Sequence, residues 1–144
     1  MDEPLLIIRD EDIFGITSEI ADSEYDIRTT VKVILFDNEN KVALVGTKYR
    51  LLPGGGVEED ETLEDAAARE CMEEVGCHVV VEGGVGMIEE YRAKVMRHQV
   101  THCFVARVVG DKGIPTTTQA DEQGMHIEWM PIADAYDFLE RQLA

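Results

Sequence analysis

The chain has 144 residues, and their apolar content fits one globular domain, residues 1–144, with a core of its own. Its 13 basic and 30 acidic residues give a net charge of −17, which disfavours a nucleic-acid polymer as partner. The three cysteines form no Cys-x-x-Cys pair, and the sequence has no signal pattern and no apolar run of membrane-spanning length. We therefore expect a cytoplasmic protein without a membrane contact, in which an anionic substrate would need added positive charge, most simply a metal ion.

The first 26 residues are acidic and only weakly patterned. An apolar run at residues 5–8 can form a short strand, and residues 22–24 are expected to be loop. This extension is long enough to add a strand to the sheet of its own chain or to a partner subunit. The sequence therefore leaves a homodimer open.

Two strands and a turn are predicted next. Residues 29–36 are rich in β-branched side chains, residues 41–45 are apolar, and the turn cluster at 37–40 joins them into a hairpin. The triple glycine at 54–56 is expected to be irregular backbone, and an acidic loop, or a short strand, follows at residues 57–61.

Residues 62–75 form the strongest predicted helix. Asp60 or Thr62 can cap its N-terminus, and alanines at 66–68 favour the helical state. Gly76 stands where a helix C-terminus commonly places glycine. The predicted helix of fourteen residues would be about 21 Å long.

The remaining sequence alternates short strands with turns and ends in a helix. The predicted elements are strands at 78–81 and 87–91 with a break or bulge at 83–86, a long strand at 100–109, a polar loop at 110–124, a strand at 127–130 and an amphipathic helix after Pro131. Strands of mixed spacing with one central and one terminal helix predict an α+β fold, a mixed β-sheet covered by helices.

Three carboxylates share one face of the central predicted helix. On a helical wheel Glu70, Glu73 and Glu74 fall within an arc of about 100°. Like charges three and four residues apart destabilise a helix, and these lie in its last two turns, where the helix dipole also disfavours anions. Arg69 can pair with Glu73 but is expected to reach the other two poorly. A cluster with so little local compensation is a candidate functional site.

A hard divalent cation would neutralise this cluster. Mg²⁺ prefers oxygen ligands and commonly bridges carboxylates to substrate phosphates. The upstream glycines at 54–56 would let the backbone approach such a ligand closely. The alternative is that the carboxylates form a solvated acidic face in an acidic protein.

The glycines and the carboxylates stand in one register. It reads Gly55-x5-Glu61-x7-Arg69-Glu70-Cys71-Met72-Glu73-Glu74-Val75-Gly76-Cys77. This run resembles the Nudix box, and every glycine and charged position of the motif matches. The departures are Cys71 and Cys77, which occupy aliphatic positions, and buried cysteine behaves as a small hydrophobe.

The resemblance implies a fold and an activity. Nudix proteins have a mixed β-sheet sandwiched between α-helices, and they hydrolyse a pyrophosphate bond in a nucleoside diphosphate linked to another group. The implied cofactor is Mg²⁺, with Mn²⁺ as a substitute.

The resemblance also implies roles for individual residues. By position in the box, Glu70, Glu73 and Glu74 are expected to bind metal together with the backbone carbonyl of Gly54, and Glu73 and Glu74 are also counted as catalytic. Arg69 would orient the carboxylates, and Gly55 and Glu61 would support the loop, unless Glu61 binds a second metal ion.

The general base is the least determined part of the implied mechanism. Some Nudix proteins use a glutamate of the box, and others use an acidic residue from a loop ahead of a late strand that contains tryptophan. Asp121 and Glu122 lie in such a loop here, shortly before Trp129. Glu122 is the external candidate, and a loop acid facing solvent is the alternative.

The substrate is only weakly indicated. Tyr91 is a candidate for stacking on a base and Arg92 for binding phosphate, although the pattern favours a structural aromatic and a solvated surface charge. His98 and His102 lie in a predicted strand, about 13 Å apart, which disfavours a zinc pair.

The short chain, and the absence of a proline that the ADP-ribose branch carries, favour a small nucleotide, such as an ordinary or oxidised nucleoside triphosphate. ADP-ribose or a nucleotide sugar is the alternative. A catalytically idle nucleotide sensor is less favoured because no carboxylate of the box is missing.

Overall fold

The computed structural model describes residues 3–15, 20–117 and 124–142. The strands are β1 (Leu6–Ile8), β2 (Asp26–Phe36), β3 (Lys41–Gly46), β4 (Gly54–Gly56), β5 (His78–Arg92), β6 (Arg97–Val109) and β7 (His126–Pro131). The helices are α1 (Asp10–Phe14), α2 (Leu63–Val75) and α3 (Ile132–Gln142), with 3₁₀ turns η1 (Asp22–Glu24) and η2 (Ala93–Val95).

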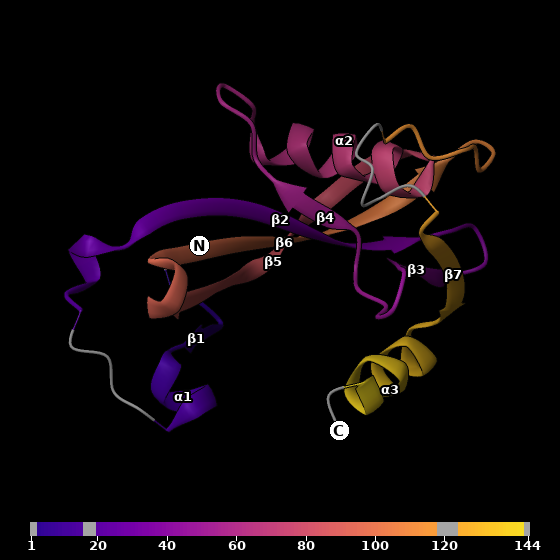
Figure 1. Ribbon diagram of the computed structural model, residues 1–144. Helices are drawn as coiled ribbons and strands as arrows, with labels where there is room; N and C mark the ends of the chain where they lie inside the picture. Colours follow the sequence, from indigo (N-terminus) through magenta and orange to yellow (C-terminus); the bar gives the residue numbers. More distant parts are fainter. Residues whose placement is uncertain (1–2, 16–19, 118–123, 143–144) are drawn as a thin grey trace.

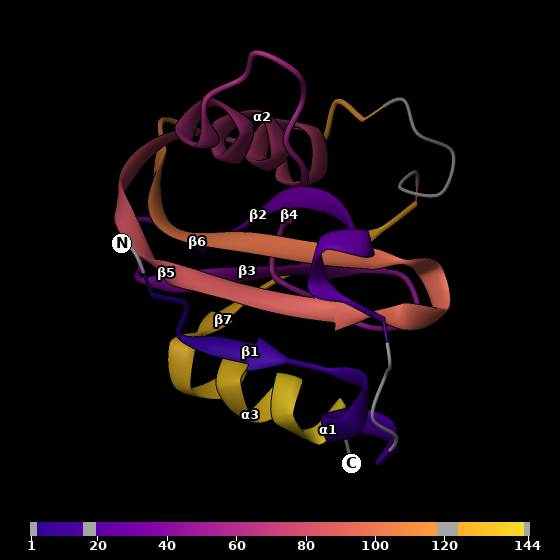
Figure 2. The same ribbon diagram turned by 90° about the vertical axis from the view of Figure 1, so that its left-hand side faces the viewer.

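These elements form one seven-stranded mixed sheet with helices on both faces. Its strand order is β1-β5-β6-β2-β3-β7, and β4 pairs with β2 off this path. α2 covers one face, whereas α3 lies on the other (Figures 1 and 2). The predicted α+β fold, with a mixed sheet between helices, is confirmed.

The N-terminal extension adds a strand to the sheet of its own chain. β1 runs parallel to β5, with Leu6 opposite Ile88. The short helix α1 follows, held by Asp10, whose Oδ2 accepts a hydrogen bond of 2.9 Å from the backbone of Ala93. Neither α1 nor η1 was predicted, because elements of three to five residues depend on such contacts rather than on a hydrophobic period.

The predicted hairpin of β2 and β3 is confirmed. Asp37 closes its turn, because its Oδ1 accepts backbone hydrogen bonds from Glu39 (2.9 Å) and Lys41 (2.8 Å). β2 nevertheless begins three residues earlier than predicted. It pairs in parallel with β6 from Asp26 onward, and this backbone pairing extends the strand through residues whose side chains stay exposed.

The triple glycine is a strand, so the prediction of irregular backbone was wrong. β4 pairs antiparallel with β2, placing Gly54 opposite Lys32 and Gly56 opposite Thr30. Glycine allows unusually close pairing here, since a Cβ on Gly54 would lie 2.0 Å from the carbonyl oxygen of Val31. Backbone hydrogen bonds need no side chain, which is why a composition that usually indicates loop can form a strand.

The two strands predicted after α2 are one continuous strand. β5 pairs antiparallel with β6 over its whole length, with register shifts between Val81 and Gly83 and between Gly84 and Gly86. Of the two alternatives, the glycine-rich stretch is therefore a bulged strand and not a break.

The core has two parts, one on each face of the sheet. Val31, Val33 and Leu35 of β2 are fully buried toward α2, and β3 contributes Val42 and Leu44 to a smaller cluster with α3. Cys71 and Cys77 are also fully buried in the α2-facing core, as expected of cysteines at aliphatic positions. In the described part of the chain, no helix is long and apolar enough to cross a membrane.

Candidate active site

Both ends of α2 are fixed by local hydrogen bonds. The Thr62 hydroxyl accepts a hydrogen bond of 3.1 Å from the backbone of Asp65, so Thr62 is the N-cap. At the other end Gly76 adopts φ +74° and donates to the carbonyl of Met72 at 3.1 Å. A helix held at both ends keeps the acidic residues of its last two turns in a defined position.

The glycines of β4 contact two of these acidic residues. The backbone nitrogen of Gly54 donates a hydrogen bond of 2.7 Å to Oε1 of Glu74. A Cβ on Gly55 would lie 2.5 Å from Oε1 of Glu70, so only glycine allows this carboxylate its position. Both carboxylates are nearly buried, Glu70 being 5% and Glu74 8% exposed. The β4 backbone and the carboxylates of α2 thus form one compact oxygen-rich cluster.

Arg69 binds more carboxylates than the helical wheel predicted. Its Nη1 donates to Glu73 at 3.2 Å, as expected, and also to Glu70 at 3.1 Å. Neighbouring helix residues do not face one another, but the long arginine stem lets the guanidinium reach across. The expectation that Arg69 reaches the other carboxylates poorly is therefore wrong for Glu70.

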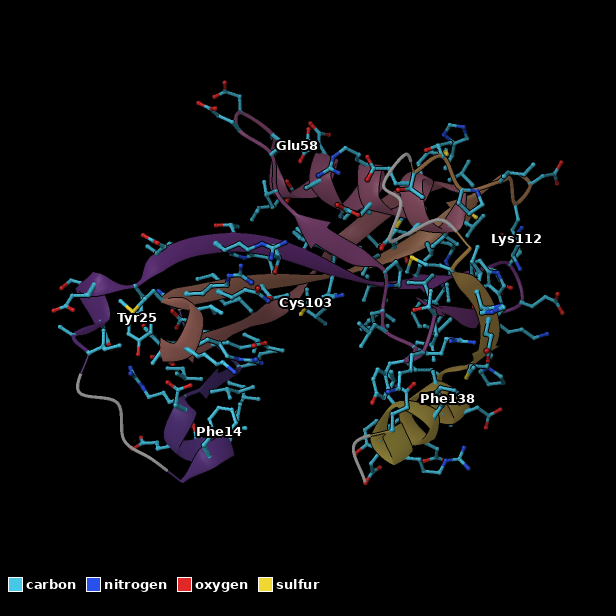
Figure 3. The ribbon with its side chains drawn as sticks, viewed as in Figure 1. Phe14, Tyr25, Glu58, Cys103, Lys112 and Phe138 are labelled. Atoms are coloured by element: carbon cyan, nitrogen blue, oxygen red, sulfur yellow. The ribbon has the colours of Figure 1, made fainter. Side chains whose placement is uncertain are left out.

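The same guanidinium closes the loop between β4 and α2. Its Nε and Nη2 donate to Glu61 at 2.7 and 3.0 Å, and Nη2 also donates to the carbonyl of Gly56 at 2.8 Å. This pairing lowers the pKa of Glu61 and raises the pKa of Arg69. Both oxygens of Glu61 thus bind Arg69, which supports the loop-stabilising role. Glu58 lies on this loop, away from the sheet (Figure 3).

A lysine lies beneath the cluster. Lys32 is half-buried and donates a hydrogen bond of 3.1 Å to the carbonyl of Leu52. Burial lowers its pKa, and the negative charges of Glu74 and Glu70 oppose that shift. Sequence reasoning missed this residue, although a lone lysine in a strand of β-branched residues is a recognisable signal.

The carboxylates engage protein donors in this structure. Glu74 holds the Gly54 amide, while Glu70 and Glu73 hold Arg69. As these side chains stand, no three acidic, histidine or cysteine residues of the described ranges form a ready cation site. The donor set is nevertheless one that fits a hard divalent cation, because several carboxylate oxygens and a glycine backbone meet in a small space.

The predicted substrate contacts lie elsewhere on the sheet. The ring of Tyr91 stacks on His98 at 4.1 Å, and the guanidinium of Arg9 lies over it, also at 4.1 Å. These two contacts occupy both faces of the ring, so base stacking would require one of them to move. Arg92 is exposed and donates to Glu90 at 2.8 Å. Substrate contact by Tyr91 and Arg92 stays a prediction.

The two histidines follow the strand prediction. Both belong to β6, and Nε2 of His98 lies 2.8 Å from a carboxylate oxygen of Glu89, not beside His102. The external base candidate Glu122 and its neighbour Asp121 lie outside the described residues.

A family model matches most of the chain. The family model described as NUDIX domain matches residues 26–144, which leaves the first 25 residues outside the match. A search of curated proteins found no match.

Several solved structures share the fold. A MutT protein from Methanosarcina mazei Go1 superimposes with a TM-score of 0.59 at 22% identity, covering 82% of this chain and 94% of that chain. A NUDIX hydrolase from Nitrosomonas europaea superimposes with a TM-score of 0.61 at 21% identity, covering 80% of this chain and 79% of that chain. A hydrolase of the NUDIX family from Clostridium perfringens superimposes with a TM-score of 0.60 at 18% identity, covering 81% of this chain and 93% of that chain.

Proposed function

The chain belongs to the Nudix family of hydrolases, and from this premise we propose that it is a Mg²⁺-dependent pyrophosphohydrolase of a small nucleotide. The contact of Gly54 with Glu74, at 2.7 Å, is the observation that carries the proposal. It brings the backbone of β4 and a buried carboxylate of α2 together, as a shared metal site requires.

The residues that would hold the ion are Glu70, Glu73, Glu74 and the carbonyl of Gly54. To bind the cation, Glu74 would release its hydrogen bond with the Gly54 amide. Glu70 would release its hydrogen bond with the guanidinium of Arg69. When bound, Mg²⁺ screens the charge of the pyrophosphate and orients its phosphoryl oxygens. Mn²⁺ offers the same preference for oxygen ligands and is the expected substitute.

Residues of the protein hold the loop and the helix of the site in place and accept a proton. Arg69 holds Glu61 and Glu73 so that the loop and the helix stay in register. In the reaction a water oxygen bonds to phosphorus, the bridging P–O bond breaks, and a carboxylate accepts the proton of the water. We propose Glu122 as this acceptor, with Glu73 as the alternative inside the box.

Replacing Glu122 by Gln tests the external base. We expect kcat to fall about 10²- to 10⁴-fold, the usual range for a general base, with little change in substrate binding. Asp121→Asn is the matched control and should cost much less. Near-normal kcat in both variants would assign the base to the box, and damage confined to Asp121→Asn would move the assignment by one residue.

A nucleoside triphosphate, ordinary or oxidised, is the favoured substrate, ahead of ADP-ribose or a nucleotide sugar. A non-catalytic sensor is disfavoured because Glu70, Glu73 and Glu74 are all present. A cytoplasmic location and a homodimer stay predictions from the sequence.

A screen of phosphate and nucleotide products tests the proposed function. Nucleoside triphosphates, diphosphates, ADP-ribose and nucleotide sugars are incubated with the protein, with Mg²⁺ and with EDTA. We expect Mg²⁺-dependent cleavage of a pyrophosphate bond, fastest with a triphosphate. Saturable nucleotide binding without cleavage in any mixture would instead identify a sensor.

A further inference from the structure

Arg28 lies on the strand that pairs with the glycines of the site. Gly56 is opposite Thr30 and Gly54 is opposite Lys32, so Arg28 precedes this paired segment by two residues. Side chains alternate along a strand, so Arg28, Thr30 and Lys32 share one face of β2. In Figure 1 this half of β2 extends beyond α2, and the Arg28 side chain is exposed.

Two guanidinium groups flank Gly56. Arg69 donates to the Gly56 carbonyl at 2.8 Å, and Nη2 of Arg28 lies 3.6 Å from the position of a Cβ on that glycine. Their surroundings differ sharply. The guanidinium of Arg69 binds Glu61, Glu70 and Glu73, whereas that of Arg28 forms no ion pair or side-chain hydrogen bond with any described residue.

An arginine without a carboxylate partner is unexpected at this place. The chain has a net charge of −17, and the loop that starts beside Arg28 carries four acidic residues at positions 58–61. A guanidinium beside such a loop would neutralise it by pairing, yet Arg28 pairs with none of the residues that the structure describes and is accessible. Its five donors are therefore available to an anionic ligand, and arginine matches phosphate oxygens in a bidentate way.

The side chains beside β4 change from carboxylates at Gly54 and Gly55 to an arginine at Gly56. The Gly54 amide donates to Glu74, a Cβ on Gly55 would meet the carboxylate of Glu70, and a Cβ on Gly56 would lie 3.6 Å from Nη2 of Arg28. Successive strand residues are about 3.3 Å apart and point to opposite faces of a sheet, so Gly54 and Gly56 are about 7 Å apart and Arg28 lies across the β4 backbone from Glu70. A phosphate chain whose scissile bond lies at the carboxylates would extend one phosphoryl group toward Arg28.

Resting on the proposed function, we propose that Arg28 binds the phosphoryl group beyond the scissile bond and makes the site selective for nucleoside triphosphates over diphosphates. Arg28 contributes no proton and no nucleophile. It recognises the additional charge that a triphosphate carries, and a diphosphate leaves it without a ligand.

The test compares kcat/KM for a nucleoside triphosphate and its diphosphate in wild type, Arg28→Gln and Arg28→Lys. Arg28→Gln should lower kcat/KM for the triphosphate about 10- to 100-fold, mainly by raising KM. It should leave kcat/KM for the diphosphate nearly unchanged. Arg28→Lys should retain part of the triphosphate kcat/KM, because lysine keeps the positive charge but lacks the planar guanidinium that binds two phosphate oxygens at once. Arg141→Gln, an exposed arginine on α3, is the matched control and should not change the ratio.

Equal losses for both substrates, or no loss for either, would overturn the proposal. Calorimetric titration with inorganic tripolyphosphate and pyrophosphate, in the presence of Mg²⁺, separates it from the proposed function. Weaker tripolyphosphate binding in Arg28→Gln, in a protein that cleaves no nucleotide, would support the Arg28 site and reject the hydrolase. Unchanged triphosphate selectivity in an active Arg28→Gln enzyme would reject Arg28 alone.

Discussion

At the scale of single residues, Gly55 determines where a buried carboxylate can lie. Glu70 is only 5% exposed, and its carboxylate occupies the space that a side chain at position 55 would fill. Neighbouring Gly54 holds Glu74 through its backbone amide. The two glycines therefore position two acidic residues of α2 without contributing a side chain.

Gly55→Ala should displace Glu70 and reduce turnover at least about tenfold, since an added methyl group would lie 2.5 Å from its Oε1. The readout is kcat with Mg²⁺, with circular dichroism confirming that the variant is folded. Gly83→Ala is the matched control, because a Cβ there meets nothing within 4 Å. If both variants keep wild-type kcat, the position of Glu70 does not depend on Gly55.

Glu61 links the acidic loop to the helix and gives a pH-dependent contribution to stability. Its hydrogen bonds with Arg69 lower its pKa in the folded state, so folding is favoured above the ordinary pKa of glutamate, about 4.3, and this contribution is lost as pH falls below it. We expect the unfolding free energy of wild type, measured in urea from pH 7 to pH 3, to fall more steeply than that of Glu61→Gln. Parallel curves over this interval would contradict the assignment.

At the scale of elements, the sequence predicts those whose pattern is local. α2 was predicted to within one residue because Thr62 and Gly76 mark its ends, and the β2–β3 hairpin was predicted from its turn residues. Elements that depend on tertiary pairing were missed or misjudged. β4 forms because β2 offers a backbone partner, and α1 forms because the β5–β6 hairpin holds it.

In the candidate site too, features that are local in sequence were predicted and features that depend on tertiary pairing were not. The spacing from Gly55 to Glu74 identified the helix carboxylates and the glycines beside them as one candidate site, because the motif is contiguous in sequence. Lys32 and Arg28 were not identified, since only strand pairing brings β2 beneath the glycines. The double contact of Arg69 also escaped, because side-chain reach is not visible on a helical wheel.

At the scale of the whole molecule, the extension and the net charge matter most. Residues 3–15 and 20–25 lie outside the family match, yet β1 joins the sheet and Arg9 pairs with Asp22 while covering Tyr91. A protein with a net charge of −17 attracts any divalent cation to its surface. A test of metal binding must therefore separate the carboxylate cluster from diffuse surface charge.

Mg²⁺ should raise the melting temperature of wild type, because the unfolded chain lacks the assembled cluster. At a concentration 100 times the Kd the stabilisation would be about 2.7 kcal/mol. The shift should disappear in the variant with Gln at positions 70, 73 and 74, measured by calorimetry at ionic strength matched with KCl. An equal shift in both proteins would mean that the ion binds diffuse surface charge.

Turnover of Glu74→Gln with Mg²⁺ tests the central claim most directly, namely that the carboxylates beside β4 carry out pyrophosphate hydrolysis. Glutamine retains an oxygen that can accept the Gly54 hydrogen bond of 2.7 Å, but it removes the charge that would bind the ion. We expect turnover to be abolished while the unfolding free energy holds or rises slightly, because repulsion between like charges is relieved. A folded variant that retains more than about a tenth of wild-type turnover would contradict the account.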